Sequence, residues 1–222
     1  MIRWISPMML GFTLVTVAQA APPESTSVGT DTSIARPDSA LTNVFRSEMA
    51  RIEIRKPAAW YFADLESMME HRASVKLKDE DFQKALTTMA SAPLVAAMKY
   101  EEPYESLNPS FQVLVRPAAT LEGKSGVEIL SMIQGGLANA FENFKVVQPV
   151  SEIKVGGRLG GRLVATYTVA TQDGLEFPTR STLVLIPRGK VIYQIGFSGP
   201  PEGPDKLTGE IDEILASVKW LE

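Results

Sequence analysis

Histidine and cysteine, the residues that most often bind metals or act as nucleophiles, are almost absent from this chain of 222 residues. His71 is the single histidine, and there is no cysteine. This composition excludes disulfides, a cysteine nucleophile and the zinc and iron sites that need two or more histidine or cysteine ligands. Charged residues flank His71, which favours a position on a helix surface over a role as a base or a ligand.

A calcium site built only from carboxylates would have its best ligands in Asp79, Glu80 and Asp81. The segment lacks the glycine and the distal glutamate of an EF-hand loop. The same acids precede an apolar stripe with helical spacing, and acidic side chains are favourable at the positive end of a helix. We therefore expect charges at a helix start, with no metal and no cofactor.

The serine and phosphate motifs of the chain are incomplete. Ser198 lacks the second spacer residue of a nucleophile elbow. Ser151 and Lys154 have the Ser-x-x-Lys spacing, but the apolar residues around them predict a strand, which would place the two side chains on opposite faces. Gly123 and Lys124 resemble the end of a P-loop whose first glycine is missing. We therefore predict no enzyme; a hydrolase based on carboxylates or a lone serine is the third hypothesis.

Two aromatic and two acidic residues occur together after a predicted strand, at Tyr100, Glu101, Glu102 and Tyr104. Functional residues often lie in such loops, although packing of the loop against its own domain would also explain them. Methionines of the same region suit an adaptable apolar surface or fill a core; they are Met68, Met69, Met89 and Met98. We predict that region 60–104, and these four loop residues in particular, binds a partner.

The elements that position these residues follow from apolar periodicity. Alternation predicts strands at 51–55, 111–115, 146–155, 162–169, 180–186 and 191–197, with an ambiguous one at 94–100. Helical spacing predicts helices within 64–92, behind a capping box of Ser125 and Glu128, and from Leu207 to Trp220. Asp173 and Gly174 predict a hairpin.

The composition is that of a globular protein: 45% of the residues are hydrophobic and 22% are charged. The net charge of −4 argues against nucleic acid as a partner. Residues 21–45 are rich in proline, serine and threonine and poor in large apolar groups, so they predict a flexible leader. Residues 46–222 are then a single domain.

The N-terminus has the pattern of a secretory signal peptide. Arg3 supplies the positive region, Met8 to Val17 the apolar run, and Ala18-Gln-Ala20 a small-x-small cleavage site. The run is too short to span a bilayer, which needs about 20 apolar residues. We predict cleavage after Ala20 and a periplasmic or secreted protein with no transmembrane anchor.

The order of these motifs resembles the PsbP-like and Mog-like superfamily, which includes the DcrB-like periplasmic proteins of bacteria. The match covers residues 50–221 and includes the strand that precedes Trp60, the capped central helix, the strand that bears Tyr167, the return at Tyr193 and the final segment to Trp220. The resemblance implies an α+β fold in which helices flank an antiparallel sheet, as an α/β/α sandwich. It also implies binding or assembly roles without catalysis, and no catalytic residues.

Two functions are therefore expected. The first is an exported, non-catalytic binding or assembly module that acts on a protein partner in the cell envelope. The second is a periplasmic protein that binds a small molecule or lipid between its sheet and its helices.

Overall fold

The computed structural model describes residues 43–64, 75–76, 93–171 and 174–222. His71, the acids Asp79 to Asp81, and the methionines Met68, Met69 and Met89 lie outside these ranges. So do the predicted signal peptide and almost all of the predicted leader. The predictions made for them therefore stay predictions.

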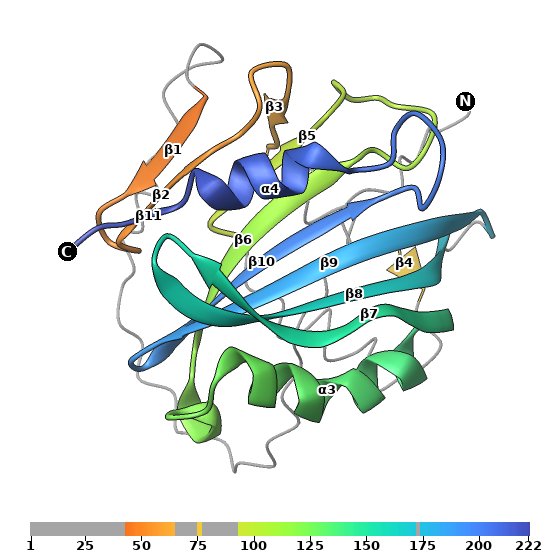
Figure 1. Ribbon diagram of the computed structural model, residues 1–222. Coiled ribbons are helices and arrows are strands. Elements are labelled where there is room, and N and C mark those ends of the chain that lie inside the picture. Colours follow the sequence, from red (N-terminus) through yellow and green to blue (C-terminus); the bar gives the residue numbers. More distant parts are fainter. Residues whose placement is uncertain (1–42, 65–74, 77–92, 172–173) are drawn as a thin grey trace, which may run out of the picture.

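Two antiparallel sheets form the domain (Figure 1). The smaller has the order β1-β2-β11; the larger has the order β3-β5-β6-β10-β9-β8-β4, and β7 also pairs with β8. The strands are β1 (Val44–Ser47), β2 (Ile52–Arg55), β3 (Tyr61–Phe62), β4 (Val75–Lys76), β5 (Val95–Met98), β6 (Ser110–Pro117), β7 (Glu142–Val155), β8 (Arg158–Thr171), β9 (Glu176–Arg188), β10 (Val191–Gly199) and β11 (Lys219–Trp220). The helices are the 3-10 turn η1 (Ala119–Leu121), α3 (Gly126–Ala140) and α4 (Gly209–Ala216). The α+β class is confirmed.

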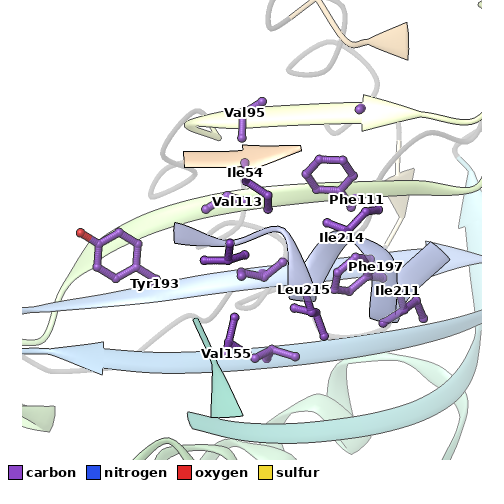
Figure 2. Packing of buried hydrophobic residues seen from close by; sticks show 14 of the residues in the cluster. Ile54, Val95, Phe111, Val113, Val155, Tyr193, Phe197, Ile211, Ile214 and Leu215 are labelled. Atoms are coloured by element: carbon purple, nitrogen blue, oxygen red, sulfur yellow. The ribbon is translucent and has the colours of Figure 1, made fainter. Parts of the chain in front are cut away.

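Apolar side chains of the long strands point alternately to the two faces of the larger sheet, and they contribute to one hydrophobic core on each face. Leu183 and Leu185 of β9 pack with Ile129 and Leu130 of α3 in one core. The intervening residues of β9 point to the other face and join the α4 side chains Ile211, Ile214 and Leu215 (Figure 2). The two helices therefore lie on opposite faces of the sheet.

The long central elements agree with the sequence predictions, and the capping box is confirmed. The Ser125 side chain accepts a hydrogen bond from the Glu128 amide, and the Glu128 carboxylate accepts one from the Ser125 amide. β1 spans the predicted boundary between residues 45 and 46, with Phe45 buried in the core.

Two predicted helices need correction. The last helix ends at Ala216 instead of reaching Trp220, because Ser217 caps it and Lys219 and Trp220 pair with β2 as strand β11. Val218 and Trp220 still pack inward, since strand spacing buries alternate residues as readily as helical spacing does. Within the predicted helical region 64–92, Val75 and Lys76 form β4 and pair with the end of β8.

Candidate functional site

The loop between β5 and β6 brings the two predicted tyrosines together. The rings of Tyr100 and Tyr104 stack with their centroids 4.6 Å apart and an interplanar angle of 17°. Both hydroxyls donate to one carboxylate: Tyr100 Oη lies 2.5 Å from Asp205 Oδ1, and Tyr104 Oη lies 2.8 Å from Asp205 Oδ2. Asp205 belongs to the connection between β10 and α4, so it joins two loops that are far apart in the sequence. We call Tyr100, Tyr104 and Asp205 the tyrosine clamp.

The buried side chain of Asn108 holds the β5–β6 loop in shape through hydrogen bonds. It is 1% exposed, and its side-chain amide donates to the Tyr100 carbonyl at 2.9 Å and to Glu102 Oε1 at 2.8 Å. The other Glu102 oxygen accepts the Tyr104 amide at 3.0 Å. Glu102 is therefore used within the loop, whereas Glu101 is exposed. Of the two predicted acids, only Glu101 is fully presented to solvent.

Lys99 adds a positive charge behind the clamp. Its Nζ lies 3.6 Å from Glu210 Oε1 and 3.9 Å from Asp205 Oδ1, and 5.7 Å from the centroid of the Tyr100 ring. Glu210 is in the first turn of α4, so Lys99 connects the loop to that helix as well. Lys99, Asp205 and Glu210 could not be predicted as part of the site, because no local pattern relates them to the tyrosines.

The hydrogen bonds and burial of the clamp shift the pKa values of its members in opposite directions. The Tyr100 hydroxyl, as a hydrogen-bond donor, lowers the pKa of Asp205 below its ordinary value of 3.8. Burial and the hydrogen bond to Asp205 raise the pKa of Tyr104 to about 12. Neither group changes its charge near neutral pH, so the clamp has no general acid or base poised for proton transfer.

We expect Tyr104 to ionise late in an alkaline titration of the folded protein. Because its folded pKa of about 12 exceeds the ordinary 10.0, its contribution to stability is complete below pH 10 and is lost as the pH rises through 12. The late step in phenolate absorbance should therefore be smaller by one tyrosine in Tyr104→Phe, while Tyr100 and Tyr167, whose pKa values are also raised, still contribute to it. The exposed Tyr61, replaced in Tyr61→Phe, is the control that should keep the step, and a wild type that lacks the step would contradict the prediction.

The serine motifs of the sequence lie in the strands of the larger sheet. Ser198 is 3% exposed, and its hydroxyl lies 3.1 Å from that of Ser110, which leaves it inaccessible as a nucleophile. Ser151 and Lys154 lie on strand β7, as predicted. Among the described residues, no three acidic or histidine side chains are grouped as metal ligands would be.

A small hollow lies between the sheet and the segment that enters α4. Its lining includes Arg180, Phe197, Leu207 and Ile211, and it measures about 210 Å³ with open solvent included. Small-molecule sites usually occupy about 300–1,000 Å³. This hollow therefore gives no support to a pocket for a ligand of ordinary size. In the described part of the chain, neither helix has the length and apolarity needed to cross a membrane.

No protein-family model matches the chain, and no curated protein matches its sequence. Among solved structures, a protein from Bacteroides thetaiotaomicron is 13% identical with a TM-score of 0.44; the match covers 81% of this chain and 48% of that one, so this chain spans about half of its length. Cyanobacterial PsbP (CyanoP) from Synechocystis is 8% identical with a TM-score of 0.47, and the match covers 84% of this chain and 98% of that one. LpqN, involved in cell envelope biogenesis of Mycobacterium tuberculosis, is 12% identical with a TM-score of 0.41, and the match covers 77% of this chain and 83% of that one. At these low identities and TM-scores, nothing about binding or activity follows from the likenesses.

Proposed function

We propose that this protein is a non-catalytic binding or assembly module that engages a protein partner in the cell envelope through the tyrosine clamp and Glu101. The observation that carries the proposal is the fixed geometry of the two stacked tyrosines. Each hydroxyl is bound to Asp205, and each residue stays partly exposed at the surface.

Fixing the rings before binding lowers the cost of association. A mobile side chain loses about 0.5–1.5 kcal/mol of entropy when an interface immobilises it. In the clamp, hydrogen bonds and stacking have already restricted Tyr100 and Tyr104. Tyrosine is also among the residues that contribute most to the binding energy of protein interfaces. The exposed carboxylate of Glu101 beside them would favour a partner that presents a cation.

The export and the superfamily are parts of the same proposal. Cleavage after Ala20 would release the chain into the periplasm, and N-terminal sequencing of the protein from its own cells tests this. Membership of the PsbP-like and Mog-like superfamily, as an α/β/α sandwich of the DcrB-like branch, is supported by the order of the sequence motifs and by the position of α3 and α4 on opposite faces of the sheet. An experimental structure of the chain would test that assignment.

A photocrosslinking amino acid at position 101 tests the proposed face in intact cells. We expect a discrete protein adduct from position 101 and none from position 213, where Glu213 is also exposed, on α4. Adding Tyr104→Ala to the position-101 protein should abolish the adduct, because the stacked pair is lost. Adding Tyr104→Phe should weaken it less, because the ring is kept.

The proposal fails if position 101 gives no adduct while the protein is exported and folded. It also fails if the adduct survives Tyr104→Ala unchanged. Thermal unfolding of the variants is the control for folding, since a variant that unfolds at growth temperature would lose its adduct for a trivial reason.

A further inference from the structure

Four segments meet at the end of the molecule that carries the C-terminus, at the left of Figure 1. They are residues 48–51 of the β1–β2 turn, 154–159 of the β7–β8 hairpin, 188–190 of the β9–β10 hairpin and the terminal residues 220–222. We call these segments the basic end.

Side-chain and backbone contacts hold the four segments together. The Arg188 guanidinium donates to the Arg51 carbonyl at 3.1 Å and to the Leu221 carbonyl at 2.9 Å. The guanidinium carbons of Arg158 and Arg188 lie 5.9 and 5.8 Å from the centre of the same Trp220 ring. The Trp220 indole donates to the Val155 carbonyl at 2.9 Å. The basic end is therefore one continuous surface.

Positive charge is concentrated on this surface. Its segments contain five cations, namely Arg51, Lys154, Arg158, Arg188 and Lys190, and two carboxylates, Glu48 and Glu222. One of the carboxylates, Glu48, is already paired with Arg46 at 2.8 Å. The side-chain charges sum to +3, and the α-carboxylate of Glu222 brings the total to +2; the side chains of the whole chain sum to −4, so cations are segregated here.

Two apolar side chains project from the same end. Met49 is 90% exposed at the tip of the β1–β2 turn, and Leu159 is 59% exposed at the start of β8. Leu159 is the cross-strand partner of Lys154 and follows Arg158 directly. The Arg51 backbone, in the same turn, has φ of +49°, a conformation that glycine adopts at lower cost.

We propose that the basic end is a docking surface for an anionic lipid membrane. The lysines and arginines would contact lipid phosphates, and Met49 and Leu159 would enter the boundary between head groups and acyl chains. This surface is separate from the tyrosine clamp, so the proposal does not depend on the proposed function.

The arrangement of the apolar residues favours a membrane over a protein partner. The core of a protein interface is an apolar patch depleted of charged residues. At the basic end, Met49 and Leu159 are instead single protrusions; Arg51 follows Met49 by two residues, and Arg158 directly precedes Leu159. Such an arrangement suits a membrane surface, where exposed lysines can meet lipid phosphates while single apolar side chains enter the lipid.

Co-sedimentation with vesicles tests the proposal. The protein should bind vesicles of equimolar phosphatidylglycerol and phosphatidylcholine far better than vesicles of phosphatidylcholine alone, and added salt should weaken binding. The double variant Lys154→Gln/Lys190→Gln should lower the affinity for the anionic vesicles about tenfold to thirtyfold. Each cation near an anionic surface contributes a substantial and roughly equal share of the binding free energy. Met49→Gln/Leu159→Gln should also weaken binding.

Matched substitutions away from the basic end provide the controls. Lys145→Gln/Lys206→Gln removes the same charge from two other exposed lysines, and Met132→Gln changes a methionine that is 58% exposed on α3. Both should bind like the wild type. Equal binding to the two kinds of vesicle, or equal losses in the basic-end and control variants, would overturn the proposal. Absence of vesicle binding together with capture of an acidic protein that Lys154→Gln/Lys190→Gln abolishes would assign the surface to that protein instead.

Discussion

Replacement of Gly126 by alanine is expected to destabilise the protein by more than about 3 kcal/mol and to prevent folding in cells. Gly126 is the first residue of α3, where the helix lies directly against the backbone of β8 and β9. A Cβ atom at this position would overlap the Gly161 amide nitrogen and the Leu185 carbonyl oxygen. Both are backbone atoms of a central sheet, so no rotamer change can relieve the overlap.

The same helix offers a matched control. Gly135 also lies in α3, but a Cβ atom there would meet nothing within 4 Å. Gly135→Ala should therefore stabilise the protein by up to about 1 kcal/mol, because alanine is the better helix former. Urea denaturation of the two variants measures the contrast. A Gly126→Ala protein that is as stable as the wild type would mean that α3 does not approach the sheet this closely.

This close contact shows what the sequence could predict about α3. The capping box of Ser125 and Glu128 identified the start of the helix, because that motif is local and its hydrogen bonds are reciprocal. No local pattern indicated that Gly126 would face Gly161, since the two residues lie on different elements. A glycine after an N-cap and a glycine in a strand each have several ordinary explanations.

The candidate site shows the same division between local and distant information. Tyr100 and Tyr104 could be predicted as a pair, because they flank a short polar loop. Asp205, which determines how they are held, lies about a hundred residues away in a proline-rich turn that appears in the sequence only as a break in the sheet. The predicted end of the last helix, at Trp220, was wrong for a related reason. Lys219 pairs with Glu53 of β2, and this distant pairing overrides the helical spacing of the apolar residues.

The clamp and the basic end would give the molecule two separate contacts with its surroundings. The clamp joins the β5–β6 loop to the start of α4, whereas the basic end gathers three hairpin turns beside the C-terminus. If both proposals hold, the protein would be oriented at a membrane surface while its tyrosine loop engages a partner. Mutations at one surface should then leave binding at the other intact, since no residue is shared.

Asp205→Ala is expected to lower the free energy of unfolding by about 2–3 kcal/mol at neutral pH. It should also make the β5–β6 loop, which carries Tyr100 and Tyr104, more mobile. Two hydroxyl donors lose their carboxylate, and hydrogen bonds to a charged group contribute about 1.5–3 kcal/mol each when well formed. The Asp205 side chain is 22% exposed, so water replaces part of the loss. Asp205→Asn should cost less, because the amide oxygen still accepts one hydroxyl while the amide nitrogen accepts none.

The effect should depend on pH in a defined direction. The pKa of Asp205 is lowered below 3.8 in the folded protein, so its contribution is complete above that value and is lost as the pH falls through the folded pKa. The difference in unfolding free energy between the wild type and Asp205→Asn should therefore be constant near neutrality and shrink in acid.

Glu202→Ala is the matched control, since Glu202 is an exposed acid in the same turn. The free energy of unfolding of this variant should stay within about 0.5 kcal/mol of that of the wild type. In Asp205→Ala, the late phenolate step of Tyr104 should move towards ordinary values, because the hydrogen bond that helps to hold its proton is gone. If Asp205→Ala and Glu202→Ala are equally stable and Tyr104 still ionises late, Asp205 does not hold the tyrosine pair, and the fixed geometry that carries the proposed function must have another source.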